Sequence, residues 1–145
     1  LKAQAQADTR FHIDLRCRDI MSKDVLCLYE DEDIQVAVEK FKQVNLMSLP
    51  VLNRAEHVCG TLALYEVVEW FQKATDLRTS WQDQVKHIMK RQVVTVQPDQ
   101  ELQDLIPYFV ERSFNYIPVV ENKALVGIIS RADMIAALYR LLQHR

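Results

Sequence analysis

The spacing of apolar residues along the first half of the chain predicts a regular alternation of strands and helices. Ile34, Ala37, Val38 and Phe41 fall at the i, i+3, i+4 and i+7 positions of one helix face, and the acidic residues 30–33 just before them are typical of a helix start. Short apolar runs predict buried strands. The other predicted elements are a helical turn at 19–21, strands at 25–28, 49–52 and 58–63, and a helix at 64–71.

The same order recurs further along the chain. Five landmark pairs lie 68 positions apart: Ile20 and Ile88, Met21 and Met89, Asp31 and Asp99, Phe41 and Phe109, and Pro50 and Pro118. Gly60 and Gly127 lie 67 apart, which predicts a longer hairpin turn in the first copy. Shared offsets of this kind indicate a tandem duplication. The predicted organisation is a lead-in (1–16), a first repeat (17–72), a connector (73–83) and a second repeat (84–145).

Three further features of the sequence concern the connector, the helix around Pro107 and the final helix. Trp70 and Trp81 are expected to pin the ends of the connector to the core. Pro107 should bend the second repeat's apolar helix, since it cannot donate to the carbonyl of Gln103. The final helix, predicted over residues 133–143, has an apolar face wider than the roughly 100° that one core requires. Packing against a partner and burial in the core both account for that width.

Composition and charge narrow the class of protein. The chain has 145 residues, of which 49% are hydrophobic and 26% charged, as in soluble globular proteins. Its net charge of −2 provides no general field to attract nucleic acid. No apolar run approaches the roughly 18 residues of a membrane span. Residues 1–8 lack a signal-peptide core, so a cytoplasmic location is expected. The missing initiator Met fits a piece of a longer protein, a processed chain or a designed boundary.

Cysteine and histidine patterns give no metal site. Cys17, Cys27 and Cys59 form no C-x-x-C pair, which favours buried reduced thiols, and the histidines lack ligand spacing. The chain also has no glycine-rich phosphate loop, nucleophile elbow or paired carboxylates with a plausible base. Enzymatic activity is therefore not expected.

Residues 127–133 end a predicted strand and begin a helix, and they bring together Ser130, Arg131 and Asp133. The first backbone N–H groups of a helix lack partners and lie at the positive end of its dipole, which suits an anion. Asp133 could accept hydrogen bonds from a vicinal diol such as a ribose. Alternatively, Ser130 could simply cap the helix by accepting a hydrogen bond from its first turn.

With these motifs in view, the chain resembles a tandem pair of CBS domains, also called a Bateman module, over about residues 17–140. The matching pieces are 19–21 with 25–26, 87–89 with 93–96, 49–51, 117–119, Gly60 and 127–133. The resemblance implies an α/β (α+β) fold of two β-α-β-β-α repeats, related by a pseudo-twofold axis, with two clefts between them. It also implies that modules commonly pair into homodimers.

The resemblance further implies an adenosine-containing ligand, such as AMP, ADP, ATP or S-adenosylmethionine, and no required cofactor. In the family's motif, Asp133 would hold the ribose hydroxyls and Ser130 a phosphate, and Arg131 could add charge. The family's adenine pocket maps to Val94, Thr95, Val96, Tyr116, Ile117 and Pro118. Tyr116 could stack on the base or serve as a core or interface aromatic.

The first repeat departs from the family pattern. Cys27 stands where the second repeat has Thr95, Ala63 replaces the hydroxyl and Glu66 replaces the aspartate, while Leu49 keeps the apolar position before its proline. The first site is therefore expected to be degenerate, and one nucleotide is expected per module.

Two organisations and two functions stay open. Residues 105–109, 116–119 and 134–140 resemble the C-terminal CBS pair of HPP-family integral membrane proteins, which would make the chain the cytosolic tail of an inner-membrane protein. A stand-alone cytoplasmic module is the competing interpretation. The expected function is ligand sensing for an attached domain or partner, and the alternative is a structural dimerisation module with no nucleotide.

Overall fold

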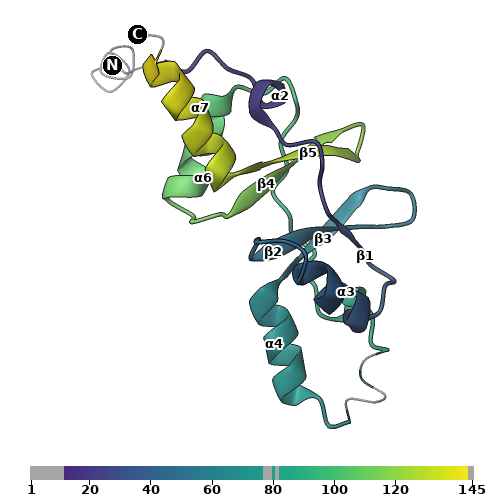
Figure 1. Cartoon of the computed structure of the whole chain (residues 1–145). Coiled ribbons are helices and arrows are strands. Elements are labelled where there is room, and N and C mark those ends of the chain that lie inside the picture. The colour runs from purple at the N-terminus through teal and green to yellow at the C-terminus, as the bar shows by residue number, and fades with distance from the viewer. Residues whose placement is uncertain (1–11, 77–79, 81, 144–145) are drawn as a thin grey trace.

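The structure is a computed structural model, and it describes residues 12–76, 80 and 82–143. Two lobes lie one above the other in Figure 1. The first lobe contains β1 (Leu28–Tyr29), α3 (Ile34–Phe41), β2 (Ser48–Leu52), β3 (Val58–Ala63), α4 (Leu64–Lys73) and η1 (Val85–His87). The second lobe contains α2 (Cys17–Ile20), η2 (Leu102–Leu105), α6 (Ile106–Val110), β4 (Tyr116–Glu121), β5 (Ala124–Ser130) and α7 (Arg131–Gln143). This mixed fold confirms the predicted class.

The first lobe is built on a sheet with strand order β1-β2-β3. β2 pairs parallel with β1 and antiparallel with β3. β1 reaches only Val51 and Leu52, so Pro50 lies on a stretch of β2 that has β3 on one side alone. A proline cannot donate to a ladder, and this one-sided stretch is where the sheet tolerates it.

The second lobe has the antiparallel pair β4-β5. Its counterpart of β1 is reduced to one parallel bridge, in which Val96 N–H donates to Pro118 O (3.0 Å) and Val120 N–H donates to Val96 O (2.8 Å). The repeated order implies a strand at 93–96, the counterpart of 25–28, and the structure forms only the bridge at Val96. The strand predicted at 25–28 is wrong in its bounds, since β1 begins at Leu28.

Both short strands have the same cause, which is that the chain crosses between the lobes at these points. Ile13 and Cys17, from before the first crossing, are buried in the core of the second lobe. Val85 and Met89, from before the second crossing, are buried in the core of the first lobe. In Figure 1, the chain runs from α2 past β5 and down to β1. Each lobe thus completes its core with a segment that precedes the other repeat.

Two reciprocal bridges mark the crossings. Ser22 and Ile128 exchange backbone hydrogen bonds of 2.8 and 2.9 Å, and Thr61 and Lys90 exchange two of 2.9 Å. A glycine lies next to each bridge. A Cβ on Gly60 would lie 2.6 Å from the Lys90 carbonyl oxygen, and one on Gly127 would lie 2.9 Å from that of Ser22. These glycines permit the close approach of the crossing backbone.

The helices follow their predicted faces closely. Ile34, Ala37 and Phe41 are the buried residues of α3, and α4 runs two residues beyond its predicted end. Pro107 lies in the first turn of α6, directly after η2. The predicted bend within one helix is therefore a change from a 3-10 helix to an α-helix. Trp70 holds the connector by donating from Nε1 to Asp83 Oδ2 (2.9 Å), while Trp81 lies outside the described residues.

The three cysteines are free, but only Cys17 is buried. Burial raises the pKa of its thiol to about 11. Cys27 and Cys59 are only partly buried, so full burial is wrong for both, and Cys59 still packs against the core of the first lobe. Among the described residues, no helix has the length and apolar content to cross a membrane.

Candidate functional site

The candidate site begins at the turn where β5 ends at Ser130 and α7 starts at Arg131. The Ser130 N–H donates to Asp133 Oδ2 (2.8 Å), and the Asp133 N–H donates to Ser130 Oγ (3.2 Å). Ser130 Oγ also donates to Asp133 Oδ2 (3.0 Å). This reciprocal arrangement is a capping box, which satisfies N–H groups of the first turn. The capping interpretation of the sequence is thereby confirmed.

A third residue reaches this carboxylate from the crossing segment. Ser22 Oγ donates to Asp133 Oδ1 at 3.0 Å, across 111 positions of sequence. The carboxylate therefore lies where a segment of the first repeat meets the turn of the second. Sequence reasoning missed Ser22, because nothing in its own neighbourhood indicates that it packs on the other repeat.

A hollow of about 200 Å3 lies beside this turn, and we name it the serine hollow. Its lining residues are Asn45, Leu46, Met47, Asn115, Ser130, Arg131 and Ala132. The first three come from the first repeat, so both repeats contribute to the hollow. Arg131 is exposed and brings the guanidinium that the sequence assigned to a phosphate.

A second hollow of about 290 Å3, named here the tyrosine hollow, adjoins the first at Asn115. It is lined by Ser48, Thr61, Lys90, Gln92, Val93, Val94, Ser113, Phe114, Asn115, Tyr116 and Pro118. Residues 113–115 match residues 45–47 at the offset of 68, so the two hollows are counterparts within the repeat. Each hollow combines a loop of one repeat with residues of the other.

Tyr116 occupies the boundary between the lobes in the tyrosine hollow. Its hydroxyl is 2.8 Å from Thr61 Oγ1, and burial raises the pKa of the phenol to about 12. The phenol is therefore neutral and buried, which places it as an interface aromatic. Tyr116 also lines the hollow, and stacking on a base there stays a prediction.

The residues assigned to one binding site are divided by the structure. Ser130 and Arg131 line the serine hollow, whereas Tyr116 and Pro118 line the tyrosine hollow. Ile117 and Val96 are buried in the core of the second lobe, and both backbone groups of Val96 are already bonded. Thr95 is exposed and lines neither hollow. Their side chains are not brought together with Asp133.

The first repeat forms the same cap without the hydroxyl. The Ala63 N–H donates to Glu66 Oε1 at 2.8 Å, matching the bond from Ser130 to Asp133. At the repeat offset of 68, Lys90 corresponds to Ser22. The Nζ of Lys90 lies 5.1 Å from the centre of the Tyr65 ring. A hydrogen bond with Tyr65 and nearby carboxylates, including Glu66, raise the pKa of Lys90. Leu49 is buried in the core of the first lobe.

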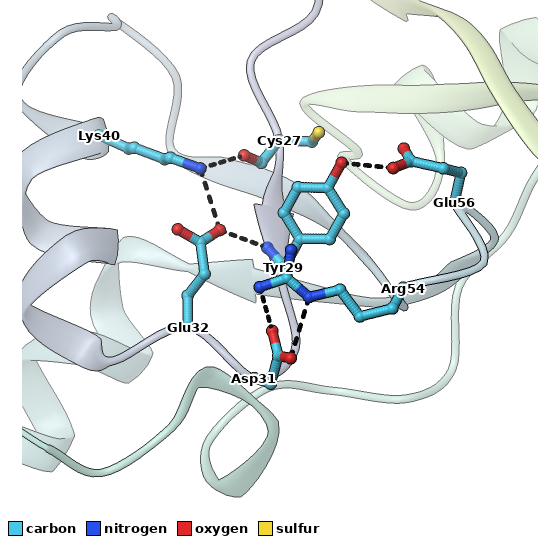
Figure 2. A network of polar contacts seen from close by, with 7 residues as sticks. All are labelled: Cys27, Tyr29, Asp31, Glu32, Lys40, Arg54 and Glu56. Carbon is cyan, nitrogen blue, oxygen red and sulfur yellow. Dashed lines mark hydrogen bonds and ion pairs between the residues drawn. The ribbon is translucent and has the colours of Figure 1, made fainter.

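Cys27, the last of the first-repeat candidates, belongs to a polar network shown in Figure 2. Its carbonyl oxygen accepts from Lys40 Nζ (3.0 Å), which also pairs with Glu32 (2.9 Å). The remaining contacts fasten a hairpin loop to the end of β1: Arg54 to Asp31 (2.9 Å), Tyr29 Oη to Glu56 (2.6 Å), and Arg54 over the Tyr29 ring (4.4 Å). This network positions the first lobe's hairpin and leaves Cys27 without a part in either hollow.

We expect Tyr116→Phe to lower the free energy of unfolding by about 1 kcal/mol, the usual net value of a buried hydrogen bond. The substitution removes the phenol hydroxyl that contacts Thr61, and Thr61 keeps only the carbonyl of Leu49 as a partner, at 3.4 Å. Urea unfolding would measure the change. The control is Tyr29→Phe, which removes an exposed hydroxyl bonded to Glu56 and should have a smaller effect. An equal effect of both substitutions would contradict this account.

The sequence matches a known family model and is similar to several curated proteins. The family model described as CBS domain matches residues 17–73 and again residues 85–140. The uncharacterized protein MJ1426 of Methanocaldococcus jannaschii is 24% identical over 83% of this chain and 89% of its own length. The carnitine transport ATP-binding protein OpuCA of Listeria monocytogenes is 26% identical over 83% of this chain, which spans only 28% of that protein.

Solved structures share the fold. CBSX2 in complex with AMP has a TM-score of 0.75 at 19% identity, covering 87% of this chain and 97% of that one. The CBS domain of a CBS-domain-containing membrane protein from Sphaerobacter thermophilus has a TM-score of 0.70 at 19% identity, covering 94% and 95%.

Proposed function

Because this chain belongs to the CBS-domain family, we propose that it is a regulatory module that binds an adenosine-containing ligand at the turn between β5 and α7. One observation carries the proposal: residues 130–132 of this turn line a hollow to which both repeats contribute, and Asp133 in the same turn accepts a hydrogen bond from Ser22 of the first repeat. A ligand held there touches both lobes and can bias their relative placement. It can do so only through different affinities for the two arrangements.

The proposed ligand is placed by the chemistry of three residues. An ionised Asp133 accepts from the ribose hydroxyls, and Ser130 and Arg131 contact a phosphate, since guanidinium groups form charge-assisted bonds with phosphate. The base lies toward residues 45–47 of the serine hollow. The AMP complex of CBSX2 supports an adenine nucleotide as the first ligand to test. AMP, ADP, ATP and S-adenosylmethionine all carry the required ribose diol.

We propose that occupancy is transmitted to an attached domain or a partner in the cytoplasm, and that the module itself catalyses no reaction. OpuCA, a transport ATP-binding protein, extends well beyond the matched region, which supports attachment to a larger protein. The Sphaerobacter thermophilus domain belongs to a membrane protein, which supports the same arrangement with an upstream membrane domain. The sequence of the full-length gene product distinguishes this arrangement from a stand-alone module.

Self-association is the second candidate function, and exposed apolar side chains on two helices favour it. Val68 and Phe71 of α4 are 63% and 55% exposed, and Ile135 and Leu142 of α7 are 65% and 60% exposed. α7 and α6 also line an apolar groove of about 380 Å3. A second copy of the chain would bury these residues. Light scattering would show a dimer, and a monomer at all concentrations would contradict this function.

Calorimetric titration tests the nucleotide proposal directly. We expect saturation near one ligand per chain, because only the second repeat combines the hydroxyl and the aspartate. At a ligand concentration of 100 times Kd, the native state gains about 2.7 kcal/mol. For a chain of this size that gain corresponds to a rise in Tm of roughly 5–10 °C. The absence of binding across AMP, ADP, ATP and S-adenosylmethionine, together with a dimer in solution, would favour the structural function instead.

A further inference from the structure

The segment that leads into α2 is fastened to the second lobe, and we name residues 15–18 the lead-in strap. Three backbone hydrogen bonds hold it: Leu102 N–H to Leu15 O (2.8 Å), Cys17 N–H to Gln100 O (2.9 Å) and Arg18 N–H to Pro98 O (2.9 Å). The Arg16 side chain adds a bond from Nη1 to Asp99 O (2.9 Å). The lead-in strap is therefore part of the second lobe, although it lies at the start of the first repeat in the sequence.

The connector contains an equivalent segment, residues 83–86, which we name the connector strap. Three backbone bonds fasten it to the first lobe, each shifted by 68 positions from its counterpart: Ile34 N–H to Asp83 O (2.8 Å), Val85 N–H to Glu32 O (2.9 Å) and Lys86 N–H to Glu30 O (2.9 Å). Each strap also buries one apolar side chain, Cys17 in the core of the second lobe and Val85 in the core of the first. The two straps are thus a matched pair within one molecule.

The lead-in strap shares its core with the helix that begins at the candidate site. Met134 lies in the first turn of α7 and is buried in the same core as Ile13 and Cys17. Release of the strap would withdraw Cys17, and Ile13 just before it, from the core on which α7 packs. The connector strap instead shares a core with Val67 of α4, the helix that follows the degenerate turn of the first repeat.

We propose that docking of the lead-in strap and ligand binding at the turn between β5 and α7 stabilise each other, so that the strap carries occupancy to a domain attached upstream. This inference rests on the proposed function. A ligand that binds only while α7 is packed opposes every local opening that unpacks α7, and release of the lead-in strap is such an opening. By linkage, an attached domain that pulls the strap away weakens ligand binding by the same factor.

Hydrogen exchange of the natural chain, with and without ligand at 100 times its Kd, tests the coupling at single amides. The ligand is AMP, or whichever of ADP, ATP and S-adenosylmethionine binds most tightly in the calorimetric titration. The reporters are the amides that donate the strap bonds: Cys17, Arg18 and Leu102 for the lead-in strap, and Val85, Lys86 and Ile34 for the connector strap.

We expect the ligand to slow exchange at the lead-in reporters by about 10- to 100-fold, since the gain in protection is limited to about 1 + [L]/Kd. Exchange at the connector reporters should slow by less than about threefold, because opening of that strap leaves the core under α7 in place. Equal slowing of both sets, or slowing of neither while the titration saturates, would overturn the coupling and leave nucleotide binding intact.

Two variants serve as controls. Asp133→Ala removes the proposed ribose contact, so the same ligand concentration should slow neither set of reporters. Arg16→Ala removes an exposed side chain that bonds Asp99 O and lies 4.0 Å from the Glu101 carboxylate. It should speed exchange at the lead-in reporters about two- to fivefold without ligand, as the loss of one hydrogen bond predicts, and leave the connector reporters unchanged.

Unchanged lead-in reporters in Arg16→Ala would show that the strap does not open as a unit, and would overturn its role while nucleotide binding stands. No saturable binding of AMP, ADP, ATP or S-adenosylmethionine to the natural chain would overturn the proposed function and this inference together.

Discussion

Replacing Gly60 with alanine is expected to lower the free energy of unfolding by about 3 kcal/mol, the upper part of the range for overpacked interiors. The new Cβ would lie 2.6 Å from the Lys90 carbonyl oxygen and 2.8 Å from Met89 Sδ. The carbonyl is backbone, and it accepts from the Thr61 N–H at 2.9 Å, so it cannot retreat without breaking the bridge between the crossing segment and β3. The position has no positive φ, so the destabilisation would be steric and not conformational.

Thermal and urea unfolding measure this effect, and Gly127→Ala is the matched comparison. The new Cβ at Gly127 would lie 2.9 Å from both Met21 Sδ and the Ser22 carbonyl oxygen. This steric clash is slightly less severe than the one at Gly60. We expect Gly60→Ala to lower Tm by roughly 6–12 °C and Gly127→Ala to lower it by less. An unchanged urea midpoint for Gly60→Ala would show that the crossing segment can move away from β3, and it would refute the close packing described here.

Elements with local causes were predictable from sequence. The helix face of Ile34, Ala37 and Phe41 and the hairpin strands β2 and β3 depend on the spacing of neighbouring residues, and the structure places them where that spacing indicates. The cap of α7 is also local, since Ser130 and Asp133 are three residues apart. For such elements the periodicity of side chains is a sufficient signal.

Elements with distant causes were not predictable from sequence. The apolar run at 25–28 resembles a buried strand, yet only Leu28 is buried, because residues 25–27 belong to the crossing. The duplication reveals two equivalent units but not which unit each segment packs on. Cys17 stands at the start of the first repeat and is buried in the core of the second lobe, and Val85 shows the reverse.

The candidate site was only half predictable for the same reason. Its local half, the turn at Ser130, follows from the motif, whereas Ser22 is brought in by the crossing segment and residues 45–47 by contact between the two lobes. Of the residues predicted to hold a base, only Val94, Tyr116 and Pro118 line a hollow, and it is the tyrosine hollow. Each hollow combines a loop of one repeat with residues of the other, so a single-repeat assignment of base and ribose residues separates at that boundary.

Asp133→Ala is expected to weaken binding of an adenine nucleotide by at least 100-fold. Hydrogen bonds to a charged group contribute about 1.5–3 kcal/mol each, and the proposed ribose makes two with this carboxylate. Their combined loss corresponds to a factor of roughly 10² to 10⁴ in Kd. The variant should also lose about 1 kcal/mol of stability, because the cap of α7 is removed. Calorimetric titration with AMP and urea unfolding would measure the two effects separately.

Glu66→Ala separates capping from binding. Glu66 caps α4 through the Ala63 N–H at the same 2.8 Å, so its removal should lower stability by a similar amount. It belongs to the repeat that has Ala63 in place of a hydroxyl, and AMP affinity should therefore be unchanged. If both variants lose stability and only Asp133→Ala loses binding, the carboxylate of the second repeat holds the ligand and does not merely cap its helix. Equal AMP affinity in the two variants would place the ligand elsewhere, with the tyrosine hollow as the alternative location, and Asp133 would then act only as a cap.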